Sequence, residues 1–387
     1  MDNDSKYSVI IVGGGPVGLL LGALLIKAGI SCRILEQNAA PTPDSRSFGI
    51  HPPSLEILSS IGLAKSMVQE GCCIRRGHAF TNTQPLGTLS FSSYPSPFNF
   101  ILSLPQNRTE QLLEQHLQKL REKVLLRGAT VVDISEKGGK VFVTYLKDQQ
   151  PVTIKADYLV GCDGKESFVR KTTGITFAEK KYPDTYVMGD FTDTTSFGND
   201  AAIYLCDEGV IESFPLPDNQ RRWVVKTKHY ILSNQRSAIE ESVSQRINRN
   251  LSQTEHSMVS SFGVQRCIAK HMVRGRIILA GDAAHVVSPI GGQGMNLGWL
   301  GVDDLAQCLQ QILINKADPG EILDSFERRR KKAVANAARR SEFNMRLGRR
   351  VTYPRLRNRL VAMMLSPPLS KFMAQLFAMR GIERWIT

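Results

Sequence analysis

Three continuous apolar runs stand out along the chain, at residues 9–12, 158–162 and 277–280. Runs of this kind, without polar alternation, are typical of short strands that are buried on both faces of a parallel sheet. Each run leads into a turn that contains glycine or aspartate, at Gly13, Asp163 and Asp282. Because ligands of open parallel sheets bind beyond the carboxyl ends of the strands, the pattern predicts a ligand-facing crevice at these turns.

Apolar residues at helical spacing predict helices between and after these runs. The first covers residues 19–28 and ends at Gly29, which suits the C′ position. Pro52 is placed to start a second helix. Asn107 and Glu110 have the spacing of a capping box, which predicts the start of a long helix there. Further helices are predicted near the C-terminus, at residues 302–314, 322–340 and 360–379, the last broken at Pro367-Pro368.

Alternating polar and apolar residues predict a second layer that is rich in strands. The alternation covers about residues 75–104 and resumes from about 177 to 265. We interpret the two segments together as the layer that binds the substrate. Three of its aromatic residues are candidates for pocket walls, although core packing is the simpler role for each: Tyr204, Phe214 and Trp223.

The glycines after the first apolar run have the spacing of a dinucleotide-binding turn. Gly13, Gly15 and Gly18 form the pattern G-x-G-x-x-G, and Glu36 follows 18 residues after the last glycine. In a βαβ unit the first glycine makes the turn, the second admits a pyrophosphate, and the third lets helix and strand pack closely. The helix N-terminus then attracts the phosphates, and Glu36 is placed to bind ribose hydroxyls.

A second glycine-rich stretch follows Asp282, with glycines at positions 291, 292, 294 and 298. Glycines there would let backbone N–H groups approach a ligand closely, and Asp282 could accept hydrogen bonds from a ribose or ribityl hydroxyl. The alternative is a tight turn in which Asp282 caps the following helix. Taken alone, this stretch does not decide between the two interpretations.

Positive charge is concentrated near the C-terminus. Residues 327–360 contain 13 Lys and Arg but only two acids, so this segment carries +11 of the chain's net charge of +13. A positive patch can attract a membrane surface, a nucleic acid or an anionic substrate, and a solvated helical face is a slightly better explanation than any one of these. No nucleic-acid-binding module accompanies the segment, which argues against a nucleic acid.

The seven cysteines are scattered and lack paired metal-ligand spacing, so the sequence predicts reduced thiols and no metal site. The sequence contains no run of about 20 apolar residues, so it predicts no transmembrane helix. The first apolar segment follows Tyr7 without a basic leader and is interpreted as a strand, not a signal peptide. These features predict a cytoplasmic protein that could associate peripherally with a membrane.

The three signatures together resemble those of the single-component FAD-dependent aromatic hydroxylases, the para-hydroxybenzoate hydroxylase family. In chain order they are Gly13-x-Gly15-x-x-Gly18 with Glu36, then Asp163-Gly164, then Gly281-Asp282 with the glycine stretch to Asn296. The resemblance extends from about Tyr7 to Arg340. The tail around Pro367-Pro368 is also similar to the hydroxylases of ubiquinone biosynthesis.

The resemblance implies roles for individual residues. The glycine turn would hold the FAD pyrophosphate, Asp282 the ribityl chain, and Pro289 with residues 292–296 the flavin ring. Pro289, Gly292 and Gln293 would form the reactive environment of the flavin, without a side-chain base. The predicted cofactor-binding residues are Gly13, Gly15, Pro16, Gly18, Glu36, Gln37, Arg46, Gln106, Arg108, Val132, Asp163, Gly164, Asp282, Gly292, Gly294, Met295 and Asn296.

The sequence therefore predicts an α/β protein with a Rossmann-type FAD-binding βαβ fold, an inserted β-rich substrate domain and a helical C-terminus. The expected FAD-binding domain comprises residues 1–75, 105–180 and 265–345, the substrate domain residues 76–104 and 181–264, and the C-terminal helices residues 346–387. The expected activity is that of a monooxygenase that uses NADPH or NADH and O2 to hydroxylate an aromatic or other electron-rich small molecule through a flavin C4a-hydroperoxide.

Two alternatives stay open at this point. One is a flavin-dependent reductase of a prenyl or other lipophilic substrate. The other is a non-catalytic FAD-binding protein that docks on a membrane or an acidic partner through the basic C-terminal segment. The sequence leaves the substrate, the choice between NADPH and NADH, and the oligomeric state open.

Overall fold

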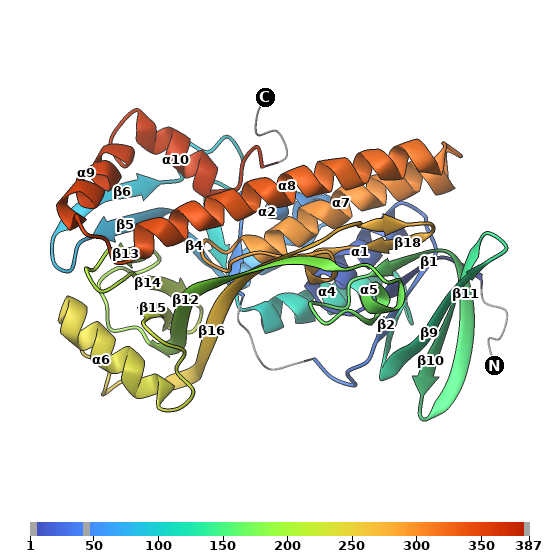
Figure 1. Cartoon of the computed structure of the whole chain (residues 1–387), viewed down its shortest axis with the longest axis horizontal. Coiled ribbons are helices and arrows are strands. Elements are labelled where there is room, and N and C mark those ends of the chain that lie inside the picture. The colour runs from blue at the N-terminus through green and yellow to red at the C-terminus, as the bar shows by residue number, and fades with distance from the viewer. Residues whose placement is uncertain (1–5, 42–46, 383–387) are drawn as a thin grey trace.

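The computed structural model describes residues 6–41 and 47–382, and within them it contains two large sheets, a small sheet and the helices that cover them (Figure 1). The first large sheet is mostly parallel. Its strands are β1 (Lys6–Val12), β2 (Cys32–Glu36), β8 (Leu125–Arg127), β9 (Ala129–Lys137), β10 (Lys140–Lys147), β11 (Gln150–Gly161), β17 (Val273–Arg274) and β18 (Ile277–Leu279). Their spatial order is β17-β18-β11-β1-β2-β8, and the antiparallel strands β10 and β9 extend from β11.

The three apolar runs form β1, the end of β11 and β18, as predicted. Every residue of these runs is apolar or small because the first sheet is covered on both faces. Val9 and Ile11 of β1 belong to a core that includes the helices α1 (Pro16–Lys27) and α7 (Gln293–Leu313). Ile10 and Val12 face the opposite core, which includes α8 (Pro319–Gly348) and the strands β9 and β10.

The second large sheet is mostly antiparallel, in the order β19-β16-β12-β15-β14-β13-β5-β6. Its strands are β5 (Arg76–Phe80), β6 (Pro85–Ser90), β12 (Phe177–Thr192), β13 (Ala201–Tyr204), β14 (Ile211–Leu216), β15 (Gln220–Thr227), β16 (His256–Ala269) and β19 (His285–Val286). One face packs against α6 (Gln235–Ile247), and the other packs partly against α8 and α9 (Pro354–Met364). A small sheet of β3 (Gly49–Ile50), β7 (Ile101–Ser103) and β4 (Cys72–Ile74) completes the set.

The division of the chain into domains stays a prediction. The strands β12 and β16 run without a break through the expected boundaries at 180/181 and 264/265. They pair with each other along most of their length. The two parts are therefore joined by continuous hydrogen-bonded strands, not by separate linkers.

Helix α4 (Gln106–Leu120) corrects one prediction about the local structure. The helix begins at Gln106 after Pro105, and no side chain caps its N-terminus. Asn107 accepts a hydrogen bond from the Arg108 N–H, and Glu110 accepts one from the Gln106 side chain. The predicted capping box of Asn107 and Glu110 is therefore wrong, because Asn107 is already the second residue of the helix and not its N-cap.

The C-terminal part is helical, as predicted, with longer elements than the sequence suggested. Figure 1 shows α8 running along the molecule from α7 at one end to α9 and α10 (Leu369–Phe377) at the other. Each long helix buries one stripe; on α8, Leu323, Phe326 and Ala337 point into the core. The remaining helices are α2 (Pro52–Ser60), α3 (Ala64–Glu70), α5 (Phe168–Thr172) and the 3-10 turn η1 (Gly281–Ala283).

Candidate functional site

Turns that are far apart in the sequence meet at one edge of the first sheet. In the parallel register, Val12 pairs with both Leu35 and Gly161, and Gly161 pairs with Leu279. The carboxyl ends of these four strands therefore lie side by side, at the place where the strand order reverses about β1. Gly13, Asp163 and Asp282 follow three of these strands, and Glu36 is the last residue of β2.

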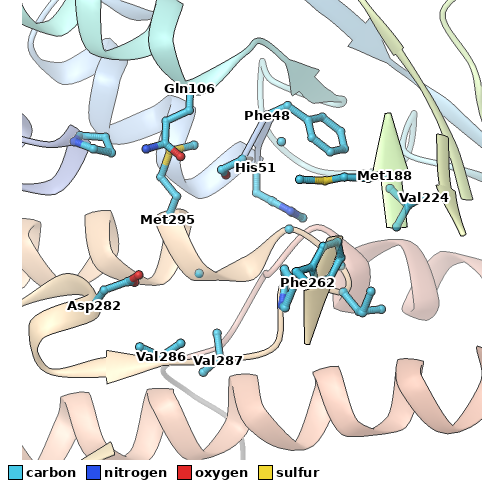
Figure 2. A pocket seen from close by; sticks show the side chains of 18 of the residues that line it. Phe48, His51, Gln106, Met188, Val224, Phe262, Asp282, Val286, Val287 and Met295 are labelled. Atoms are coloured by element: carbon cyan, nitrogen blue, oxygen red, sulfur yellow. The ribbon is translucent and has the colours of Figure 1, made fainter. Parts of the chain in front are cut away.

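These residues line a cavity of about 1160 Å³ that continues from this edge to the second sheet. Ligand pockets of single small molecules usually measure about 300–1,000 Å³. Figure 2 shows Asp282 and Gln106 at one end of the cavity, His51 between the ends, and Met188 and Val224 at the other. The cavity is therefore large enough for a cofactor with a second molecule beside it.

The glycine turn has the shape that a pyrophosphate needs. Gly13 has a φ of +107°, and an ideal Cβ there would lie 2.4 Å from the Cys162 carbonyl oxygen. An ideal Cβ at Gly18 would lie 2.0 Å from the Gly13 oxygen, so Gly18 lets α1 pack closely on β1 without lining the cavity. Gly15 lines the cavity, and its ideal Cβ has no protein atom within 4 Å. The space beside Gly15 is therefore open to a ligand.

Two helix N-termini open onto the cavity. Helix α1 begins after Gly15 and helix α7 begins after Gly292, and neither has a side chain that caps its first N–H groups. Pro16 lines the cavity at the first helix, and Gly294 and Met295 line it at the second. Free N–H groups and the partial positive charge of a helix N-terminus attract anionic groups. Both ends are thus suited to phosphate or to a negatively charged ring.

The carboxylate of Glu36 is held in place by the backbone. Its two oxygens accept hydrogen bonds from Gly14 N at 2.7 Å and Asn38 N at 2.8 Å. Each oxygen can still accept a further hydrogen bond. Glu36 and its neighbour Gln37 line the cavity, which fits the predicted contact with a ribose.

Asp282 faces the cavity and does not cap a helix. It lies in η1, which has no side-chain cap, and its carboxylate forms no hydrogen bond with any described residue. Although the side chain is open to the cavity, the surrounding protein raises its pKa to about 6 by desolvation, which Lys165 partly offsets. A carboxylate in this position lacks hydrogen-bond donors, which ribityl or ribose hydroxyls would supply. The capping interpretation of Asp282 is therefore wrong.

Asp163 combines a structural contact with a place on the cavity wall. Its two oxygens accept hydrogen bonds from Ser167 Oγ at 2.6 Å and from Val169 N at 3.0 Å, which fixes the start of α5. Burial raises its pKa, and these hydrogen bonds oppose the shift. Gly164 lies beside it on the cavity wall. The predicted pair Asp163-Gly164 is thus present at the cavity.

Two residues that were predicted to bind the cofactor have side chains that point away from the cavity. Arg108 forms an ion pair with Glu70, with Nη2 2.8 Å from Oε1, and does not line the cavity. The side chain of Val132 is 41% exposed, whereas its neighbour Val131 is buried and lines the cavity. Alternate residues of a strand face opposite sides, which explains the error at Val132. Arg46 lies outside the described residues.

Asn296 holds the glycine stretch through hydrogen bonds, and Gln293 is buried beside it. Asn296 is fully buried and accepts a hydrogen bond from His51 N at 2.8 Å. It also donates to the carbonyl oxygens of Gly49 and Gly292, each at 2.8 Å, so it ties α7 to β3. Gln293 is buried, and neither residue lines the cavity. The predicted direct contact of Asn296 with the cofactor is therefore replaced by a positioning role, and the side chain of Gln293 does not reach the cavity. Pro289, Gly292, Gly294 and Met295 do line the cavity.

Several cavity residues had no signal in the sequence. His51 lies close to Gly292, and burial lowers its pKa to about 4, so the imidazole is neutral near pH 7. Glu110, the partner of Gln106, also lines the cavity, and burial raises its pKa. Among the three aromatic candidates for pocket walls, Phe214 lines the cavity, whereas Tyr204 and Trp223 are in the core under α6.

Comparisons with known proteins identify the family of the chain. The family described as FAD binding domain matches residues 6–341. An uncharacterized aromatic compound monooxygenase of Bacillus subtilis is 33% identical over 350 residues, which are 88% of this chain and 69% of that protein. A 12-dehydrotetracycline 5-monooxygenase/anhydrotetracycline 6-monooxygenase of Streptomyces rimosus is 29% identical over 390 residues, covering 96% of this chain and 76% of the relative.

A solved structure supports the fold over the full length. The p-nitrophenol 4-monooxygenase of Pseudomonas putida superimposes with a TM-score of 0.90 and covers 99% of this chain and 100% of its own. At 22% sequence identity this likeness shows the fold alone. Together with the match over residues 6–341, it confirms the predicted α/β class. The chain belongs to the FAD binding domain family and is a FAD-dependent monooxygenase.

Proposed function

We propose that the protein uses NADPH or NADH and O2 to hydroxylate an aromatic small molecule. One observation carries the proposal: a single cavity joins the glycine-lined edge of the first sheet to an apolar face of the second. The first end offers helix N-termini and carboxylates to a dinucleotide, and the second offers Met188, Phe214 and Val224 to an apolar ring. The Bacillus subtilis relative, which is named for aromatic compounds, supports the same assignment.

The chain's own residues bind and orient the reactants. Bound FAD would supply the chemistry of hydride uptake from NAD(P)H and of O2 activation, which inserts one oxygen atom into the ring and releases the other as water. The N–H groups of Gly294 and Met295, at the start of α7, are placed to stabilise negative charge on the reduced ring. The apolar side chains of Met188, Val224 and Phe262 in the lining help to keep water from the reacting atoms. His51 presents a neutral imidazole between the two ends.

Turnover with labelled O2 tests this proposal. We expect the FAD-loaded protein to oxidise NAD(P)H faster when its aromatic substrate is present, and to form one molecule of hydroxylated product and one of water per NAD(P)H. Mass spectrometry across phenols, quinolones and quinone precursors should find one labelled oxygen atom in the product when O2 is labelled. Labelled water should contribute none.

The two alternative functions give different results in the same assay. A reductase of a prenyl or other lipophilic substrate would consume NAD(P)H without O2 and leave no labelled oxygen in the product. A non-catalytic FAD-binding protein would retain FAD and oxidise no NAD(P)H with any compound tested. Either result contradicts the proposal.

The basic segment 327–360 is only partly available to a partner. Arg349 Nε lies 2.9 Å from Asp184 Oδ1, and the buried Arg357 donates to the Leu205 carbonyl oxygen at 2.6 Å. In all, six of its basic residues are buried or ion-paired: Arg329, Arg330, Lys331, Arg340, Arg349 and Arg357. The others are exposed: Arg328, Lys332, Arg339, Arg346, Arg350, Arg355 and Arg359. Much of the positive charge of segment 327–360 is thus buried or paired with acidic side chains of the same chain.

The last two helices present an apolar surface beside some of these exposed charges. On α9, Leu356 is 68% exposed and Met363 is 55% exposed; on α10, Phe372 is 53% exposed. We call the set Leu356, Leu360, Met363, Leu369 and Phe372 the α9–α10 surface. Among the described residues no single helix is long and apolar enough to cross a membrane, although α9 and α10 together pass that test and meet at 93°.

We propose that the α9–α10 surface docks on an anionic lipid bilayer. The surface combines apolar side chains with the exposed cations Arg355, Arg359 and Lys371, the composition that favours binding at a membrane interface. The other faces of the same helices line the cavity through Val361 and Met373. This proximity would let a lipophilic substrate pass from the bilayer to the cavity.

Sedimentation with vesicles tests the docking proposal. We expect the protein to pellet with phosphatidylglycerol vesicles and much less with phosphatidylcholine vesicles. The double variant Leu356→Ser/Phe372→Ser should reduce the partition coefficient at least about tenfold, since each exposed apolar side chain contributes on the order of 1.5–3 kcal/mol when fully buried.

A matched control is available at Leu232, which is 86% exposed in the segment before α6. Leu232→Ser should leave vesicle binding unchanged. Equal losses in the control and the double variant, or no binding of the wild-type protein to anionic vesicles, would rule out docking through the α9–α10 surface.

A further inference from the structure

A single carboxylate of the second sheet faces the cavity among the described residues, that of Glu212 on β14. Along this strand Ile211 packs into the core under α6, while Glu212 and Phe214 line the cavity. This arrangement follows from the alternation of side chains along a strand. Glu212 is therefore directed to the cavity by the register of the sheet.

The neighbours of Glu212 on that face are apolar. Its cross-strand partners are Ile203 on β13 and Val224 on β15, and Met188 on β12 pairs with Val224 to continue the row. All three line the cavity. Figure 2 shows Met188 and Val224 projecting toward the cavity from adjacent strands, at the end away from Asp282. One acidic group thus stands among apolar neighbours on this part of the cavity floor.

The cations on this face of β15 are engaged by other acids. Arg222 binds Asp190 through two hydrogen bonds of 2.6 and 2.7 Å, and Lys226 Nζ lies 3.1 Å from Asp184 Oδ1. The carboxyl group of Glu212 forms no hydrogen bond or ion pair with any residue of the described ranges. Burial raises its pKa to about 7. A buried polar group without a partner is costly, so a ligand that supplies a donor here is favoured.

We propose that Glu212 binds the substrate by accepting a hydrogen bond, and that the substrate is an uncharged aromatic molecule with a phenolic O–H or a ring-attached N–H. This inference rests on the proposed monooxygenase function, since it places the substrate at the apolar end of the same cavity. A donor on the ring satisfies the carboxylate, while Met188, Phe214 and Val224 contact the ring itself. A substrate with a carboxylate at this end would be repelled.

The same hydrogen bond would assist the reaction. A phenolic O–H that donates to a carboxylate makes the ring richer in electrons at its ortho and para carbons. As the new C–O bond forms, the O–O bond of the activated oxygen breaks and the phenolic proton passes to Glu212. When aromaticity returns, the proton lost by the ring carbon passes to the second oxygen atom, which leaves as water, and Glu212 gives a proton back to the phenolic oxygen. The carboxylate ends the cycle unchanged.

Three matched probes separate the hydrogen bond from simple apolar binding: 2-naphthol, 2-methoxynaphthalene and 2-naphthoate. At about pH 8, where Glu212 is mostly ionised, we expect the FAD-loaded wild-type protein to bind 2-naphthol at least about 10-fold more tightly than the methyl ether, because only the naphthol offers a donor to a charged acceptor. Glu212→Leu should remove this preference. Glu212→Gln should retain part of it and bind 2-naphthoate about 10-fold more tightly than wild type does, because the repelling charge is gone. Calorimetric titration measures all three constants without turnover.

Glu208→Gln is the matched control, because Glu208 is exposed and its substitution removes the same charge from the same part of the chain. It should leave all three affinities unchanged. Thermal unfolding and FAD content verify that each variant is folded; Glu212→Leu should be no less stable than wild type, since it removes an unpaired carboxylate from an apolar face.

The outcomes for Glu212 and for the monooxygenase function are distinguishable. If 2-naphthol binds no more tightly than its ether to the wild-type protein, or if Glu212→Leu keeps the preference, the assignment of Glu212 is overturned even where hydroxylation occurs. If the preference depends on Glu212 while no compound receives oxygen from O2, the binding role stands and the proposed reaction fails.

Discussion

Gly15→Val is expected to abolish FAD binding by a protein that otherwise folds normally. Nothing in the protein lies within 4 Å of an ideal Cβ at Gly15, so a larger side chain has room in the apoprotein. The backbone there has φ −76° and ψ −178°, an extended conformation that valine adopts readily. The new side chain would occupy the space that the phosphates need at the start of α1. We expect the dissociation constant for FAD to rise at least about 100-fold, equivalent to about 2.8 kcal/mol.

Gly18→Ala is the matched comparison. It should destabilise the fold, which Gly15→Val should not do. Its Cβ would lie 2.0 Å from the backbone oxygen of Gly13, which cannot move without displacing the turn. Overpacking of this kind should lower the free energy of unfolding by about 3 kcal/mol. Thermal unfolding of the two apoproteins and fluorescence titration with FAD measure both effects. If Gly15→Val keeps its FAD, or loses as much stability as Gly18→Ala, the pyrophosphate does not lie beside Gly15.

Asp282→Ala should weaken FAD retention by about 10- to 150-fold. The side chain faces the cavity without a hydrogen-bond partner in the described protein, so hydroxyl groups of the cofactor are its natural donors. Hydrogen bonds to a charged group contribute about 1.5–3 kcal/mol, which sets this range. Equilibrium dialysis against FAD provides the measurement. Retention equal to that of the wild-type protein would show that Asp282 does not bind the cofactor.

The apoprotein of Asp282→Asn offers an independent test that depends on pH. Burial raises the pKa of Asp282 from 3.8 to about 6, so the folded apoprotein holds this proton more tightly than the unfolded chain does. The contribution of Asp282 to stability therefore falls as pH rises from about 4 to about 6, where the folded group ionises. Asparagine does not ionise. The difference in Tm between Asp282→Asn and wild type should shift in favour of the variant across this interval and then level off. A constant difference would contradict the desolvation of Asp282 on the cavity wall.

The parts of the site that depend on local sequence were predictable. Gly13 needs a positive φ and Gly18 needs the absence of a Cβ, and both requirements follow from the turn between β1 and α1. The strand β1 could be recognised because alternate residues enter two different cores, which makes the run apolar throughout. The placement of Glu36 at the end of β2 follows from the same βαβ unit.

The errors occurred where a side chain had a choice of direction or partner. Arg108 and Gln106 are both in the first turn of α4, yet Arg108 turns to Glu70 and only Gln106 reaches the cavity. Neither the spacing nor the composition of the chain indicates which of the two is selected, because Glu70 comes from α3. The prediction for Val132 was wrong for a related reason. A shift of one position along a strand moves a side chain from the cavity side to the solvent side.

The sequence by itself determined the three apolar strands, their turns and the glycine spacing, because each depends on residues that are close together along the chain. Only the tertiary structure decided that Asp282 faces a cavity, and that Asn296 supports the glycine stretch instead of contacting it. It alone also placed Glu212 on an apolar floor whose cations are already bound to Asp184 and Asp190. The physical reason is that desolvation and unpaired charge are properties of an environment, and this environment is assembled from strands far apart in the chain.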